Sequence, residues 1–335
     1  MKSSPRLVVL CGAGASYDCA PEGADIRTEF RPPLVQSLFE PRFGNILSGF
    51  PKAQAISEEI RTVATTSQSL EEVLAKFAQK GSIRRRRQYR QVPLYLRQVM
   101  GECGAQFLKH GATNYDTLIG QVEDSSFAHV AYVTVNYDVL LDLAVAGLYW
   151  YSPITELGQY VVPERAWQIY KLHGSINWGV ALHNVGDHQA GTLAALDSVD
   201  TLDFDFETVR VLQGFHLKHL AAEGRTFYPW LSVPERSKEG FSCPNSHLDS
   251  LRQDLQECTA VLLIGYSGLD EHVNEMLYDT PQLRSVFVVA GSVQAASEVR
   301  SRMGPLSGRM GLYDGGFSQF LRSGVAGDWL RQNAN

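Results

Sequence analysis

The sequence predicts an α/β protein built on a parallel sheet, and two observations carry this prediction. Four short apolar runs, rich in β-branched residues, each end in glycine or polar residues, and segments of helical texture separate them. Buried parallel strands have this pattern because helices cover both faces of their sheet, with ligand loops at the carboxyl ends of the strands. The runs cover residues 8–17, 128–138, 259–267 and 285–292, and residues 168–173 form a shorter candidate.

The first run, VVLCGAGASY (8–17), ends in a loop that contains Gly12, Gly14 and Ser16. Glycines let the backbone approach a ligand closely, and amide groups at the start of a following helix favour an anion, so a phosphate is the expected ligand. The third glycine of the dinucleotide fingerprint G-x-G-x-x-G would fall at Tyr17, which argues against a dehydrogenase turn. From this loop alone, nucleotide binding and an ordinary strand-to-helix turn both stay open.

Two segments interrupt the alternation of strands and helices. About a hundred residues before the second run have helical texture, for example SLEEVLAKFAQ (69–79), where Ser69 and Glu72 are spaced as a capping box. We therefore expect a helical subdomain inserted into the sheet topology at about 30–125. Residues from about 180 to 236 have mixed patterns with no clean period, and they predict a second small insertion.

Composition excludes several classes of protein. Apolar residues make up 44% of the 335-residue chain and charged residues 20%, as in globular rather than disordered proteins. The net charge of -6 argues against a dedicated nucleic-acid surface. The five cysteines are scattered without a C-x-x-C pair, so neither a disulfide framework nor a metal is expected. No apolar run has the length of a membrane helix or a signal peptide, and we expect a cytoplasmic protein without a membrane contact.

The run IRRRRQYR (83–90) is the strongest local charge feature. It fits a solvated helix face or a contact with an acidic neighbouring subunit, and a nucleic-acid contact is the alternative. This run does not decide the function.

Polar clusters follow the predicted strands: GAGAS (12–16), TVNYD (134–138), KLHGSINW (171–178) and GYSGLD (265–270). With these four motifs in this order, the sequence resembles the sirtuin (silent information regulator) superfamily. The resemblance is specifically to its prokaryotic NAD-consuming branch, found in anti-phage defence proteins, in a stand-alone form. RPPLVQSLF (31–39) and YPWLSVPERSK (228–238) also look like segments of this branch, and the resemblance covers roughly residues 5 to 300.

The resemblance implies a Rossmann-like sheet in a catalytic domain at 1–305, followed by a C-terminal extension at 306–335. It further implies that NAD+ is bound as substrate. In that arrangement the backbone amides of Gly12, Ala13, Gly14 and Ser16 surround the diphosphate, and Gly265 and Ser267 approach the adenosine. Asp138 would hold the ribose, although a helix N-cap is the alternative and slightly preferred reading. Asp270 is expected to cap the helix that follows it.

Members of this family cleave the bond between nicotinamide and ribose, and the resemblance places Asn136 and His173 at that bond. Its cleavage has an oxocarbenium-like transition state and a leaving group that needs no acid. An amide suits the positioning of a water or hydroxyl, and an imidazole suits general base catalysis. The chain lacks the four zinc cysteines and any evident acetyl-lysine motif of the deacetylases, so hydrolysis of NAD+ is expected rather than deacylation.

Three other functions are alternatives to NAD+ hydrolysis. IGYSG resembles a nucleophile elbow, but Leu269 stands where G-x-S-x-G needs its last glycine. HNVGDH (183–188) and CPNSH (243–247) lack metal-ligand spacing, and we expect them to be solvent-exposed loops. A regulatory module that binds NAD or ADP-ribose could keep the glycine loop, but the retention of both Asn136 and His173 favours an enzyme.

The expected partners follow from the same resemblance. We expect a homo-oligomer that is activated by assembly with a separately encoded partner, for which a HerA-type motor ATPase is the first candidate. The alternative is a regulatory subunit of such a defence complex that contributes to nucleic-acid cleavage. The arginine run is the only hint of contact with nucleic acid.

Overall fold

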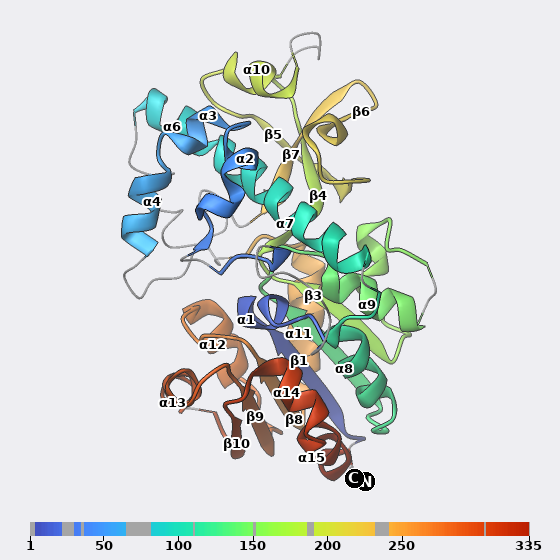
Figure 1. Ribbon diagram of the computed structural model, residues 1–335. Coiled ribbons are helices and arrows are strands. Elements are labelled where there is room, and N and C mark those ends of the chain that lie inside the picture. Colours follow the sequence, from blue (N-terminus) through green and yellow to red (C-terminus); the bar gives the residue numbers. More distant parts are fainter. Residues whose placement is uncertain are drawn as a thin grey trace.

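The chain folds into two lobes, which a computed structural model describes for residues 4–21, 30–34, 37–64, 82–109, 111–149, 152–185, 191–231, 241–304 and 306–334. Figure 1 shows one lobe built on a parallel sheet and a second lobe of helices and a smaller sheet above it. Two hydrophobic cores correspond to the two lobes. The segment 69–79, with its expected capping box, lies outside the described residues.

The first lobe contains a six-stranded sheet whose order is β10-β9-β8-β1-β2-β3, with every neighbouring pair parallel. When these six strands are numbered along the chain and read from the β3 edge, their order is 3-2-1-4-5-6, which is the doubly wound order. The predicted α/β class with a Rossmann-like parallel sheet is therefore confirmed. The central strand pairs on both sides, Val9 lying opposite Tyr132 and Leu262. The strands are β1 (Arg6–Cys11), β2 (His129–Thr134), β3 (Trp167–Lys171), β8 (Ala260–Ile264), β9 (Ser285–Val289) and β10 (Arg309–Tyr313).

Helices cover both faces of this sheet. Leu251 of α11 (Asn245–Glu257) and Val273 of α12 (Glu271–Tyr278) pack with Val8 and Val133 of the strands. The helices α8 (Asn114–Glu123), α9 (Leu140–Tyr149), α14 (Gly316–Arg322) and α15 (Val325–Asn333) pack as a group, for example through the rings of Tyr115 and Phe317. The short α1 (Ala13–Tyr17) follows β1, and α13 (Val293–Arg302) packs on β9 and β10.

The second lobe joins the helical insertion to a small antiparallel sheet of order β5-β4-β7-β6. Its long helix α7 (Gln91–Lys109) packs on β4 and β7. Buried Arg97 of α7 donates hydrogen bonds to the carbonyls of Ile176, Gly214 and Phe215, which joins the insertion to the sheet. The other helices are α2 (Gly44–Leu47), α3 (Pro51–Gln54), α4 (Ser57–Ala64), α6 (Ile83–Tyr89) and α10 (Thr192–Asp197), and the strands are β4 (Gly174–Leu182), β5 (Phe204–Val211), β6 (Ala221–Ala222) and β7 (Arg225–Leu231).

The expected domain boundaries differ from this arrangement in two places. Residues 306–335 were expected as an extension, whereas β10 forms the edge of the parallel sheet and α14 and α15 pack against α8. The insertion expected at 30–125 includes α8, whose buried side chains belong to the core of the parallel sheet. The described part of the expected extension, 306–334, thus packs as part of the parallel-sheet lobe.

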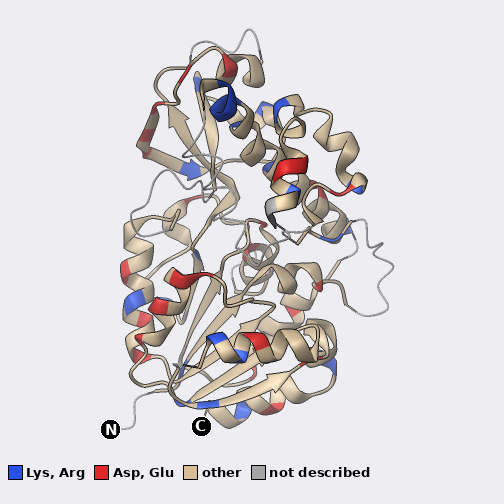
Figure 2. Cartoon of the chain, turned by 90° about the vertical axis from the view of Figure 1, so that its left-hand side faces the viewer, with Lys and Arg blue, Asp and Glu red and all other residues tan. Residues whose placement is uncertain are grey.

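The arginine run forms helix α6, and its side chains contact groups of the same chain. Arg85 pairs with Glu59, and Arg87 pairs with Asp200 at 2.6 Å. Arg90 is buried and donates to the carbonyls of Val199 and Asp200. Figure 2 shows basic and acidic residues interspersed over both lobes. These intramolecular contacts account for much of the run without a nucleic acid. None of the helices described here combines the length and hydrophobicity needed to cross a membrane.

Candidate active site

A cavity of about 450 Å³ lies at the carboxyl ends of β1 and β8, where the sheet order reverses. Doubly wound sheets bind ligands at such a switch point because the loops diverge there. All nine residues predicted to bind or act on NAD+ line this one cavity: Gly12, Ala13, Gly14, Ser16, Asn136, Asp138, His173, Gly265 and Ser267. The structure therefore brings them together, and their roles stay a prediction.

The glycines of the first turn face a second turn of the protein itself. The Gly12 amide donates to the Ile264 carbonyl at 2.9 Å, and the Gly14 amide donates to the Gly265 carbonyl at 3.0 Å. A Cβ on Gly12 would lie 2.6 Å from the Gly265 oxygen, and Gly265 itself has φ of 58°. These glycines are thus explained by the close approach of β1 and β8. The amides of Gly12 and Gly14 already have acceptors, which differs from their expected role as phosphate donors; the Ala13 amide has no acceptor among the described residues.

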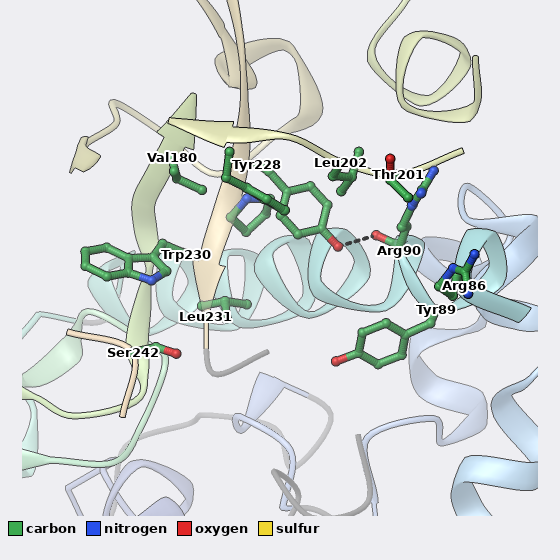
Figure 3. Close-up of a pocket in the computed structure, with 12 residues that line it drawn as sticks. Arg86, Tyr89, Arg90, Val180, Thr201, Leu202, Tyr228, Trp230, Leu231 and Ser242 are labelled. Carbon is green, nitrogen blue, oxygen red and sulfur yellow. Dashed lines mark hydrogen bonds between the residues drawn. The ribbon is translucent and has the colours of Figure 1, made fainter. Parts of the chain in front are cut away.

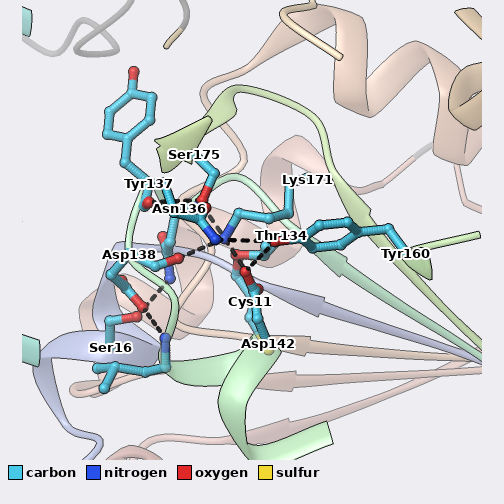
Figure 4. A network of polar contacts seen from close by, with 12 residues as sticks. Cys11, Ser16, Thr134, Asn136, Tyr137, Asp138, Asp142, Tyr160, Lys171 and Ser175 are labelled. Carbon is cyan, nitrogen blue, oxygen red and sulfur yellow. Dashed lines mark hydrogen bonds and ion pairs between the residues drawn. The ribbon is translucent and has the colours of Figure 1, made fainter. Parts of the chain in front are cut away.

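Asn136 is held by the loop after β2, and Figure 4 shows its contacts. Its backbone amide donates to the hydroxyl of Thr134, which itself donates to the Cys11 carbonyl. Its Nδ2 donates to the Gly12 carbonyl at 2.8 Å and to Ser16 Oγ at 2.9 Å. A carbonyl can only accept, so this bond fixes the orientation of the amide. Both donors are used, and Oδ1 is the atom left to accept a hydrogen bond from a ligand.

Asp138 lies two residues further on, and its Oδ1 accepts a hydrogen bond from the Leu140 amide at the start of α9. Val139 directly precedes α9 and its carbonyl accepts the first bond of the helix, so Asp138 lies one position before the N-cap that the sequence favoured, although its carboxylate does bind the first amide of α9. Asp138 also lines the cavity. The backbone carbonyl of Asp138 accepts a hydrogen bond from Lys171 Nζ, so the end of β3 also holds this loop in place.

Sequence reasoning missed a buried ionic network under this loop, which Figure 4 also shows. Lys171 is fully buried and its Nζ lies 3.0 Å from Asp142 Oδ1, while the Tyr160 hydroxyl donates to Asp142 Oδ2 at 3.0 Å. Burial raises the pKa of Asp142, although Lys171 and Tyr160 act in the opposite direction. The sequence does contain a signal for this pair, since Asp142 and Lys171 each lie within an apolar segment. Charged residues are almost never fully buried unless they are paired.

His173 lies where the chain passes from one sheet to the other, between the end of β3 and the start of β4. The next residue, Gly174, has φ of 78°, and a Cβ there would lie 2.0 Å from the Trp230 carbonyl, so the sharp turn requires glycine. His173 is buried, and its Nε2 lies 2.7 Å from Asp270 Oδ2. This contact was not predicted.

Asp270 has two roles because its two oxygens face different groups. Oδ1 accepts a hydrogen bond from the Val273 amide at 3.0 Å, which confirms the expected cap of α12. Oδ2 faces His173. Burial raises the pKa of Asp270, but the hydrogen bond and charge of His173 outweigh it, so the pKa lies below its usual value. Asp270 is therefore held as a carboxylate.

The remaining walls come from both lobes. Pro32, Pro33, Leu34, Leu38 and Met100 of the insertion form an apolar side of the cavity. Arg302 of α13 also lines the cavity, where it donates to the Ser267 carbonyl at 2.7 Å and pairs with Glu298. The cavity thus has the mixture of apolar walls and a few fixed polar groups that small-molecule sites share.

The expectation of exposed loops at 183–188 and 243–247 holds only in part. His183 is exposed, but Cys243 and His247 are buried, and residues 186–188 lie outside the described part of the chain. His247 packs against the rings of Tyr160 and Trp178, which explains its burial. Within the described ranges, no three His, Cys, Asp or Glu side chains are grouped as metal ligands.

A second cavity of about 450 Å³ lies in the other lobe, between α6 and the antiparallel sheet (Figure 3). Two basic side chains line it, Arg86 and Arg90. Arg90 already donates to backbone carbonyls, and the Tyr228 hydroxyl donates to the Arg90 carbonyl. This cavity contains none of the predicted site residues, so the switch-point cavity is the better candidate.

Solved structures that are similar to the chain include a Sir2 homologue in complex with NAD, at 13% identity and a TM-score of 0.46 over 99% of this chain and 91% of that chain. Another is Sir2Tm bound to a propionylated peptide, at 13% identity and a TM-score of 0.43 over 98% and 94% of the two chains. A third is Sir2 with a p53 peptide and NAD+, at 14% and 0.42 over 98% and 95%. No protein-family model and no curated protein sequence matches the chain. Likeness at this level describes neither an activity nor a substrate of this chain.

Proposed function

We propose that this chain is a sirtuin-like NAD+ glycohydrolase, which binds NAD+ at the switch point and hydrolyses the bond between nicotinamide and ribose. The observation that carries the proposal is the meeting of four motifs, far apart in the sequence, in one cavity that contains both Asn136 and His173. Named neighbours fix the side chains of both Asn136 and His173, as catalysis by positioning requires.

In this proposal the diphosphate lies against the turn at 12–16, with the Ala13 amide as a donor. Gly265 and Ser267 approach the adenosine, and the nicotinamide ribose lies near Asn136 and His173. No metal takes part, and NAD+ is the substrate rather than a resident cofactor.

The reaction needs little proton transfer to the leaving group. The C1′–N1 bond breaks with its electron pair going to the pyridinium nitrogen, so nicotinamide leaves neutral. Water forms the new bond to C1′ and gives a proton to His173, and the product is ADP-ribose. Asn136 Oδ1 accepts a hydrogen bond from the water or a ribose hydroxyl and so orients it.

The biological role follows the resemblance described above. We propose a cytoplasmic protein that acts in anti-phage defence by NAD+ depletion, in the manner of abortive infection. Self-assembly and a partner such as a HerA-type motor ATPase would activate it. The free cysteines, all buried, suit a reducing compartment.

The decisive test is NAD+ consumption by the purified protein, alone over a range of concentrations and with the candidate ATPase, with products separated by chromatography. We expect nicotinamide and ADP-ribose. Asn136→Ala and His173→Ala should each lower the rate by about 10²-fold or more, the scale of a positioned acid–base group.

Two exposed residues of the other lobe provide matched controls, because His183→Ala and Asn184→Ala remove the same side-chain types outside the cavity and should leave the rate unchanged. Equal losses in the control variants would contradict the assignment of the site. NAD+ that binds without turnover under every condition would instead support the regulatory subunit.

A further inference from the structure

The contact between His173 and Asp270 joins two motifs that the proposed reaction treats separately. His173 follows β3, and Asp270 begins α12 after β8, so two loops on opposite sides of β1 meet here. Their side chains are 2.7 Å apart, His173 is 2% exposed, and the Asp270 side chain is 13% exposed. An ionised carboxylate accepts hydrogen bonds and cannot donate one. Nε2 of His173 is therefore the atom that carries the proton.

Asp270 itself cannot rotate freely, because its other oxygen caps α12. Oδ1 accepts from the Val273 amide at 3.0 Å, which directs Oδ2 toward the imidazole. The carboxylate is thus fixed at one end by a helix and presents its other end to a histidine. Triads of nucleophile, histidine and carboxylate use a carboxylate in this way to select the tautomer of the histidine.

We infer that Asp270 is a positioning residue, which holds His173 in the tautomer with its proton on Nε2 and its basic lone pair on Nδ1. This inference rests on the proposed function for its consequence, since the proton of the attacking water is then taken by Nδ1. Asp270 itself remains a carboxylate throughout and acts on the reaction only through His173.

The substitution Asp270→Asn tests this because the helix cap fixes the orientation of the new amide. Asparagine is as good an N-cap as aspartate, so Oδ1 should keep its bond to the Val273 amide. The Nδ2 group then replaces Oδ2 and offers a donor to Nε2. Nε2 of His173 must accept that hydrogen bond, so the ring proton moves to Nδ1. Nδ1 then has no lone pair with which to take a proton from water.

Nitrogen-15 spectra of the histidine rings give a readout that is independent of NAD+ turnover. His173 is assigned by comparison with His173→Gln among the nine histidines of the chain. At pH 9 we expect the Nε2–H tautomer in the natural protein and the Nδ1–H tautomer in Asp270→Asn. Any other tautomer in the natural protein would overturn the inference, whether or not the protein hydrolyses NAD+.

Kinetics supply the second readout. We expect Asp270→Asn to lower kcat by about 10²-fold with little change in KM, because the tautomer affects proton transfer and not binding. Asp270→Ser is the matched control, since serine also caps the helix but does not reach His173; it should leave a mixture of tautomers and an intermediate rate. Equal kcat in Asp270→Asn and the natural protein would overturn the inference.

The two failures can be told apart. Absence of NAD+ hydrolysis with the expected tautomers would reject the proposed function and keep the arrangement of Asp270 and His173. Hydrolysis with unchanged tautomers in Asp270→Asn would reject the arrangement and keep the function. Thermal unfolding of the Asn and Ser variants checks that the cap is preserved, and similar Tm values are expected.

Discussion

The two ends of the Asn136 amide differ, because the nitrogen is used within the protein and only the oxygen is left for the proposed ligand. Nδ2 is committed to Gly12 and Ser16, so the group that the sequence identified as both donor and acceptor has only its oxygen to offer. The motif T-x-N-Y-D identified the residue but not the direction of its hydrogen bonds. That direction depends on Gly12, which lies far away in the chain and becomes a neighbour only in the folded sheet.

His247 provides a prediction about the pH dependence of stability. Burial lowers the pKa of His247 from 6.5 to about 4, and the hydrogen bond with the Leu157 backbone only partly opposes this. The unfolded chain therefore binds a proton at a pH where the folded chain does not, and the free energy of unfolding should fall as the pH drops from about 6.5 to 4. The full shift corresponds to about 3 kcal/mol.

Denaturant unfolding between pH 7 and 4 measures this effect. His247→Gln should flatten the decline, whereas His183→Gln, which changes a half-exposed histidine, should leave it as it is. An identical decline in His247→Gln and in the natural protein would show that other groups cause it.

At the scale of elements, the turns after β1 and β8 form one unit. Gly265 has a left-handed φ of 58°, and a Cβ would lie 2.1 Å from the Ala15 amide nitrogen. We predict that Gly265→Ala lowers the free energy of unfolding by about 2 kcal/mol or more, because strain and overlap add. The comparison is Gly291→Ala, after the next strand, where a Cβ meets no atom within 4 Å and a change within about 0.5 kcal/mol is expected. Equal stability in urea of the two variants would contradict this account.

The strands of the parallel sheet could be predicted because burial on both faces produces continuous apolar runs. All five predicted strands are present, at 6–11, 129–134, 167–171, 260–264 and 285–289. The sixth, β10, was missed because an edge strand is only partly buried and RMGLY carries no apolar run. The strand β5 is missed for the same reason, since FDFETVRV is partly exposed on both faces. The Asp270–His173 pair has no sequence signal, because only the order of β3 and β8 around β1 brings them together.

At the scale of the whole molecule, the cavity is closed by both lobes. Its polar end belongs to the parallel sheet, while Leu38 and Met100 belong to the core of the insertion lobe. A ligand there should therefore protect backbone amides in both lobes. We predict that saturating NAD+ slows hydrogen exchange both in the turn at 12–16 and in α7 around Met100. The reason is that a bound ligand stabilises the segments it contacts against local opening.

Hydrogen exchange with mass spectrometry measures this in His173→Ala, which is expected to bind NAD+ without consuming it. Protection restricted to the parallel-sheet lobe would mean that the insertion does not contact the ligand. Protection around Tyr228 and Trp230 would instead place the ligand in the second cavity.

The amide bonds from Gly12 to Ile264 and from Gly14 to Gly265 also bear on the order of folding. The first turn obtains its acceptors only after β8 lies beside β1, and β8 is translated late in the chain. A nascent chain on the ribosome can form the helical insertion and pair β1 with β2 long before that point. The loop near the N-terminus is thus among the last parts of the molecule to acquire its native contacts, and we expect an incomplete chain that ends before β8 to lack a finished cavity.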